Sequence, residues 1–132
     1  MVDASAVAEY LLRTPAGDAV EAAIRDDLVR LHTPALCDVE VASILRRALL
    51  EDRLSVERVA EALDDYLILP LTRHGHLPLL GRILVLRHNF SAYDSCYLAL
   101  AERLEGSLLT GDRKLAAAAR RHLALDVRPT EA

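Results

Sequence analysis

Short apolar runs alternate with helix-like stretches along most of this 132-residue chain. The runs with the length of strands lie at residues 1–2, 28–32, 66–71, 107–110 and 124–127. They lack the polar alternation of a half-exposed sheet, as expected where both faces of a parallel sheet are buried. The pattern therefore predicts parallel strands connected by helices.

The stretches between these runs repeat apolar residues at helical spacing. They predict helices at about 4–13, 15–26, 34–52, 55–65, 77–87, 91–105 and 112–121. Thr14-Pro15 and Thr33-Pro34 each place a hydroxyl before a proline, which is typical of a helix start, and Ser55 is a further predicted N-cap. Together the elements predict a three-layer α/β/α fold, with a central parallel sheet of four to five strands and one domain over residues 1–132.

The composition narrows the possible functions. Hydrophobic residues make up 52% of the chain but aromatic residues only 4%, so we expect a core of Leu, Ala, Val and Ile. The net charge of -4 argues against a protein that coats nucleic acid through overall positive charge. Cys37 and Cys96 lie in apolar helical patterns, which is typical of buried free thiols and predicts a reducing, cytoplasmic setting.

The chain shows no signal for a membrane. Asp3 and Glu9 lie where a signal peptide would carry a basic region followed by an apolar run. The longest apolar runs are far shorter than the roughly 20 residues that a bilayer span requires. We therefore expect no membrane partner.

Four acidic residues lie after predicted strands or in the first two turns of predicted helices. Asp3 directly follows the first predicted strand, and Asp112 follows the fourth. Because loops at the carboxyl ends of parallel strands form the ligand crevice, both side chains are expected to point into it. Asp94 lies one turn into a helix, and Glu40 lies about two turns into another, at the edge of its apolar arc.

Each aspartate also has an ordinary structural explanation. Asp3 and Asp112 stand at predicted helix N-caps, and Ser91 with Asp94 resembles a capping box. Taken singly, each of these residues is better explained as a cap than as a metal ligand. The sequence at these positions is therefore compatible with both roles.

Glu40 lies too deep in its helix to cap it, so its structural alternative is a pair with Ser43 or Arg47. As a set, four carboxylates around one crevice would repel each other unless a cation neutralised them. Hard oxygen ligands of this kind suit Mg²⁺ or Mn²⁺. The set therefore favours a metal site for phosphoryl chemistry.

Four motifs carry a family resemblance, in this order: "VDASAV", "PALCDVEVASILRR", "SAYDSCYLALAE" and "LLTGDRKLA". The chain resembles the PIN-domain ribonucleases, and within them the VapC-type toxins of bacterial type II toxin–antitoxin systems. The resemblance implies that Asp3, Glu40, Asp94 and Asp112 bind Mg²⁺ or Mn²⁺, with Asp3 and Asp94 as the firmest ligands. It also implies that the hydroxyls of Ser5 and Thr110 orient water or the carboxylates.

The resemblance further implies the activity and its partners. The protein would be a metal-dependent endoribonuclease that activates water for attack on a phosphodiester of tRNA, rRNA or mRNA. A small VapB-type antitoxin would neutralise it, and the toxin would form a homodimer within a larger toxin–antitoxin assembly. An apolar groove is a candidate site for the antitoxin, or else simply core, and its residues are Leu12, Leu45, Leu49, Val59 and Leu63.

Basic side chains at the rim of the site would bind the RNA phosphates away from the cleaved bond. The candidate cations there are Arg46, Arg47, Arg73, His74, Arg87, His88, Arg113 and Lys114, each of which has a solvated surface charge as its alternative.

Two other functions are compatible with an α/β fold. A non-catalytic interaction module would keep the fold and bind a partner only. A receiver-like phosphoacceptor domain would need an acceptor after the third strand and a lysine after the fifth, but these strands end in "PLTRHG" and "DVRPTEA". The histidines show no i, i+4 pair of the kind that binds zinc, and no Gly-rich phosphate loop is present.

Overall fold

The computed structural model describes residues 1–130, and its strands form two parallel pairs. Strand β1 (Leu31–Pro34) pairs with β2 (Leu71–His74), so that Leu31 lies opposite Leu71. Strand β3 (Leu108–Thr110) pairs with β4 (Val127–Pro129). The α/β class is therefore confirmed, and so is the parallel direction of the strands.

The predicted continuous sheet of four to five strands is wrong. Between the two pairs lies only the start of the chain, where Val2 forms a single parallel bridge to Leu109. The amide of Val2 also donates to the carbonyl of His32, 3.0 Å away, so these first residues link the two pairs. The predicted first strand is reduced to one bridge because Asp3 already caps a helix that begins at Ala4.

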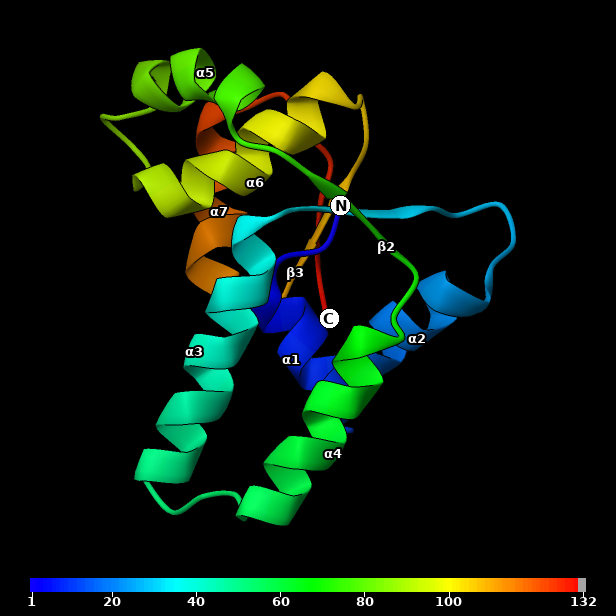
Figure 1. Cartoon of the computed structure of the whole chain (residues 1–132). Helices are drawn as coiled ribbons and strands as arrows, with labels where there is room; N and C mark the ends of the chain where they lie inside the picture. Colours follow the sequence, from blue (N-terminus) through cyan, green and yellow to red (C-terminus); the bar gives the residue numbers. More distant parts are fainter. Residues whose placement is uncertain (131–132) are drawn as a thin grey trace.

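All the predicted helices are present, with ends displaced by a few residues (Figure 1). They are α1 (Ala4–Leu11), α2 (Asp18–Arg25), α3 (Leu36–Leu50), α4 (Val56–Leu67), α5 (Leu80–Val85), α6 (Ala92–Arg103) and α7 (Arg113–His122). Short 3₁₀ turns, Pro15–Gly17 and Leu77–Leu79, precede α2 and α5. Helices α6 and α7 contact the strands, and α1 contacts β3 as well as α2, α3 and α4.

The predicted strand at residues 66–71 is wrong. Helix α4 continues through Tyr66, which is buried, and Ile68 beyond its end is 81% exposed. The strand follows at Leu71–His74, where three of the four side chains are polar and form no apolar run. A short apolar run does not distinguish a strand from the buried stripe of a helix, and here Tyr66 belongs to such a stripe.

The helix start predicted at Thr33-Pro34 is also wrong, because both residues belong to β1. The Thr33 hydroxyl donates to the carbonyl of Val2 at 3.0 Å, so this side chain links two extended segments and caps no helix. By contrast, Ser55 caps α4 as predicted and accepts a hydrogen bond from the amide of Arg58 at 3.1 Å.

The core contains mainly Leu, Val and Ala, as the composition indicates, and both cysteines are buried free thiols. The apolar groove predicted between the early helices is largely filled by these core contacts. Leu45 is buried, while Leu12 and Val59 pack against the core. The chain's own side chains therefore occupy the groove at these three residues, whereas Leu63 is 45% exposed.

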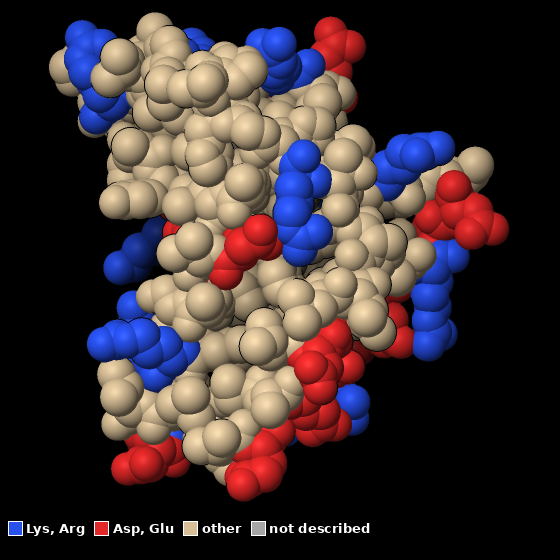
Figure 2. All heavy atoms as spheres, in the orientation of Figure 1, with Lys and Arg blue, Asp and Glu red and all other residues tan. Residues whose placement is uncertain are grey.

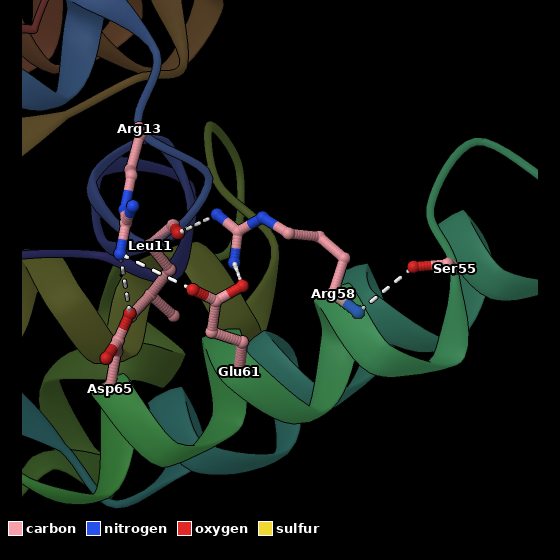
Figure 3. Close-up of polar contacts among 6 residues, drawn as sticks. All are labelled: Leu11, Arg13, Ser55, Arg58, Glu61 and Asp65. Carbon is pink, nitrogen blue, oxygen red and sulfur yellow. Dashed lines mark hydrogen bonds and ion pairs between the residues drawn. The ribbon is translucent and has the colours of Figure 1, made fainter.

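Helix α1 is fixed at its far end by a side chain from α4 (Figure 3). Nη2 of Arg58 donates to the carbonyl of Leu11 at 2.7 Å, and its Nη1 lies 3.6 Å from Glu61 Oε2. Arg13 extends the network to Glu61 and Asp65 at 3.6 Å and 3.9 Å. Helix α4 therefore satisfies a carbonyl at the last turn of α1, which has few partners within its own helix.

Acidic side chains gather along α4 on the face seen in Figure 2. Helix α4 carries Glu57, Glu61, Asp64 and Asp65. This distribution agrees with the net negative charge of the chain. Within residues 1–130, no helix has the length and apolar character needed to cross a membrane.

Candidate functional site

A pocket of about 220 Å³ gathers the four acidic residues that the sequence singles out. Asp3 and Ser5 come from the start of α1, Glu40 from α3, Asp94 from α6 and Asp112 from the start of α7. The rest of the lining consists of Ala4, Ser43, Ile44, Arg47, Tyr97 and Leu115. Residues that are up to about a hundred positions apart in the chain thus meet at one site.

Asp3 is the most firmly held of the four acids, and it is only 5% exposed. Its Oδ1 accepts hydrogen bonds from the Ser5 hydroxyl at 2.6 Å and the Ala6 amide at 2.9 Å. Its Oδ2 accepts from the hydroxyl of Thr110. Burial, together with the charge of Asp112, raises the pKa of Asp3, although these three hydrogen bonds act in the opposite direction.

The two predicted hydroxyl residues tie Asp3 to the loop after β3. The Ser5 hydroxyl accepts a hydrogen bond from the Gly111 amide at 2.9 Å, and the Thr110 hydroxyl accepts from the Asp112 amide at 3.0 Å. Thr110 is fully buried behind the pocket and does not line it. A Cβ at Gly111 would lie 3.3 Å from the Ser5 hydroxyl, so this close approach favours glycine.

Asp112 is the N-cap of α7, as its place in the sequence suggests. Its Oδ1 accepts hydrogen bonds from the amides of Lys114 at 2.9 Å and Leu115 at 3.0 Å. Both capping bonds use the same oxygen, so the cap does not consume Oδ2. Capping and a role in the pocket are therefore compatible for this carboxylate.

Asp94 also combines a helix start with the pocket. Its amide donates to the Ser91 hydroxyl at 3.0 Å, which confirms Ser91 as the N-cap of α6. Burial raises the pKa of Asp94, and the charges of Asp112 and Glu40 raise it further. The negative charges of Glu40 and Asp112 thus disfavour the ionisation of Asp94.

Glu40 has a partner that sequence reasoning missed. The phenol of Tyr97 donates to Glu40 Oε1 at 2.5 Å, whereas the expected partners were Ser43 or Arg47. Tyr97 is 3% exposed, and burial, with the neighbouring Cys37 and Glu40, raises the pKa of its phenol, which therefore stays a neutral donor. One signal was available, because Tyr97 lies three residues after Asp94 and hence on the same side of α6.

The four carboxylates line the pocket without converging on one point. Nowhere in the part of the chain that the structure describes do three His, Cys, Asp or Glu side chains lie close enough to hold one metal ion. Their chemistry nevertheless fits a hard divalent cation, because all four supply oxygen ligands. Burial raises the pKa values of Asp3 and Asp94 and the neighbouring carboxylates raise them further, and a cation in the pocket would favour the charged forms of both.

Among the cations predicted for the rim, Arg47 is the one that lines the pocket. Arg73 pairs instead with Asp38 at 2.8 Å, and Arg87 donates to the carbonyl of Leu84 at 2.9 Å. His74 contacts another histidine, with its Nε2 2.9 Å from His32 Nδ1. Structural partners thus explain Arg73, Arg87 and His74.

Comparison with known proteins agrees with this geometry. The family model of the PIN domain matches residues 1–121. The chain belongs to the PIN-domain family. This PIN domain is 42% identical over 122 residues to ribonuclease VapC1 of Mycobacterium tuberculosis, covering 89% of each protein. It is also 42% identical to ribonuclease VapC9 and 38% identical to ribonuclease VapC12 of the same organism, covering 87% and 88% of each chain.

The matched region contains all four acids of the pocket, from Asp3 to Asp112. Membership of the PIN-domain family also removes the receiver-like phosphoacceptor as an alternative for this fold. The non-catalytic interaction module remains, because it would have the same fold.

Proposed function

We propose that this PIN domain is a Mg²⁺- or Mn²⁺-dependent endoribonuclease and a toxin of the VapC type. The observation that carries the proposal is the single pocket lined by Asp3, Glu40, Asp94 and Asp112. The names of its relatives support it, since VapC1, VapC9 and VapC12 are all called ribonucleases. An acidic pocket on an acidic protein would hold an RNA phosphate only with a cation between them.

The chain's own residues would have distinct tasks in this reaction. Asp3, fixed by three hydrogen bonds, would provide a rigid ligand, and Glu40, Asp94 and Asp112 would complete the charge that holds the cation. When bound, a divalent cation lowers the pKa of water and neutralises charge at the phosphate. Arg47 would contact the RNA phosphate beside the cut, because it is the cation that lines the pocket.

The partners belong to the same proposal. A small VapB-type antitoxin would neutralise the protein in the cytoplasm, and the toxin would form a homodimer within a larger assembly. The similarity to VapC proteins over most of both chains supports this biological setting. Size-exclusion chromatography of the protein alone, and after co-expression with a small protein encoded beside it, would measure both associations.

Cleavage of RNA by the purified protein, free of antitoxin, tests the activity. We expect cutting of structured RNA in Mg²⁺ or Mn²⁺, no cutting in EDTA, and a loss of about 100-fold or more in Asp3→Asn and Asp94→Asn, which each remove a metal ligand. Asp64→Asn is the matched control, since Asp64 is an exposed carboxylate on α4 outside the pocket. Normal cleavage by both pocket variants would show that the site is assigned wrongly.

The interaction module predicts a different result. Such a protein would keep the fold and bind a partner, but it would have no need of a cation in the pocket. Calorimetric titration with Mn²⁺ at neutral pH separates the two functions, because the nuclease requires binding that Asp94→Asn weakens. Absence of Mn²⁺ binding by the wild-type protein would favour the module.

A further inference from the structure

Helix α3 carries two carboxylates that each accept a hydrogen bond from a buried tyrosine. Tyr66 of α4 donates to Asp38 Oδ1 at 2.6 Å, and Tyr97 of α6 donates to Glu40 Oε1 at 2.5 Å. The two phenols are 4% and 3% exposed as whole residues, and both lie beside the buried thiol of Cys37. The same kind of contact therefore occurs twice on one helix, two residues apart.

The two contacts differ in whether they border the acidic pocket. Glu40 and Tyr97 line the acidic pocket, whereas Asp38 and Tyr66 do not. Asp38 instead pairs with Arg73 at 2.8 Å, so its charge already has a partner in the protein. The hydrogen-bonded pair formed by Glu40 and Tyr97 is the one placed to serve the pocket.

We propose that Tyr97 is a positioning residue, whose phenol holds Glu40 Oε1 so that Oε2 remains free to bind the divalent cation. This inference rests on the proposed function and adds a residue that acts on the cation through Glu40. A glutamate side chain loses considerable rotamer freedom when it becomes a ligand. A donor that already fixes one oxygen reduces that loss and orients the other oxygen.

Tyr97 is suited to this task by its surroundings. Its ring belongs to the main hydrophobic cluster, so the phenol oxygen has little freedom to move. It also lies one turn after Asp94 on α6. One helix would thus provide the carboxylate of Asp94 and the support for Glu40, which would keep α3 and α6 in register across the pocket.

Replacing only the hydroxyl separates positioning from packing. Tyr97→Phe keeps the ring in the core and removes the hydrogen bond to Glu40, and Tyr66→Phe does the same for Asp38 as a matched control. We expect Tyr97→Phe to weaken Mn²⁺ binding, measured calorimetrically, by about 10-fold or more, the usual effect of removing a group that orients a metal ligand. Tyr66→Phe should bind Mn²⁺ like the wild type.

Kinetics provide a second measurement. In Tyr97→Phe the Mg²⁺ concentration for half-maximal cleavage should rise by a similar factor, while the rate at saturating Mg²⁺ falls less. In a Glu40→Gln background, the same tyrosine substitution should cause no further loss of Mn²⁺ affinity, because its effect passes through the carboxylate. If Tyr97→Phe does not fold, Glu40→Asp tests the same contact from the other side, since the shorter side chain withdraws from the phenol and should weaken Mn²⁺ binding to a similar degree.

Three results would overturn the inference. The first is that Tyr97→Phe binds Mn²⁺ with the affinity of the wild type, or that Glu40→Asp does so if Tyr97→Phe does not fold. The second is an equal loss in Tyr66→Phe, which would indicate general loosening around Cys37. In both cases cleavage by the wild type would leave the proposed function intact. The third is the absence of Mn²⁺ binding by the wild type, which would remove the proposed function as well.

Discussion

At the scale of single residues, helix capping and a place in the pocket occur together. Asp3 caps α1 and Asp112 caps α7, and both carboxylates line the same cavity. The reason is geometric, because each stands where an extended segment ends and a helix begins. The partial positive charge of a helix N-terminus also favours a carboxylate there, which offsets part of the repulsion between the acids.

Asp112 allows the two roles to be separated by substitution. Asp112→Asn keeps a side-chain oxygen that can cap α7 but removes the charge, so we expect strongly reduced cleavage and little change in the unfolding free energy. Asp112→Ala removes the cap as well and should lower that free energy by about 1 kcal/mol. Urea unfolding and RNA cleavage, measured on the same preparations, check both statements.

Ser55→Ala is the control for capping alone, because Ser55 caps α4 and lies outside the pocket. It should lose a similar amount of stability and keep its cleavage activity. If Asp112→Asn cleaved RNA at the wild-type rate, the charge of Asp112 would have no part in the reaction.

The sequence predicted where the acids meet and named the two hydroxyls that hold Asp3, but it did not reveal the partner of Glu40. Asp3 and Asp112 could be placed because they follow extended segments that run in parallel, Val2 bridging to Leu109 of β3. The partner of Glu40 was missed because helical spacing aligns Glu40 with Arg47 on α3, whereas its hydrogen bond crosses to Tyr97 on α6. A contact between two helices depends on their packing, and the period of one helix does not reveal it.

At the scale of elements, the helices were predictable and the strands were less so. Apolar spacing and caps such as Ser55 and Ser91 mark helix boundaries locally. The strands are only three or four residues long, and their pairing partners lie far away in the chain. The run at residues 66–71 was therefore predicted as a strand, although most of the strand lies after it.

Helix α1 links the pocket to α4, because Asp3 stands at its start and Arg58 contacts its last turn. Arg58→Ala should lower the unfolding free energy by about 1–3 kcal/mol, since the carbonyl of Leu11 would lose a charged donor. The control Arg53→Ala removes an exposed ion pair with Glu51 and should change it by less than about 1 kcal/mol. Urea unfolding of both variants measures the difference, and equal effects would contradict a specific role for Arg58.

At the scale of the whole molecule, the acidic pocket makes folding sensitive to pH. Burial, together with neighbouring carboxylates, raises the pKa values of Asp3 and Asp94 in the folded protein. As the pH rises above the usual range of aspartate, the unfolded chain therefore releases these protons before the folded protein does. The folded state loses stability through this interval, and the loss is complete once the pH exceeds the raised pKa values.

Asp94→Asn should remove part of the loss of stability that accompanies the rise in pH. In EDTA at pH 7 the variant should therefore unfold at a higher temperature than the wild type. At pH 3, where Asp94 of the wild type is protonated and uncharged, the unfolding midpoints of the two proteins should be similar.

Mn²⁺ at pH 7 should raise the unfolding midpoint of the wild type, because a ligand that binds the folded state stabilises it, and should raise that of the variant much less. Thermal unfolding followed by circular dichroism measures both proteins under all three conditions. A lower midpoint for Asp94→Asn in EDTA at pH 7 would show that the charge of Asp94 stabilises the fold, contrary to the expected cost of burying that charge beside Asp112 and Glu40.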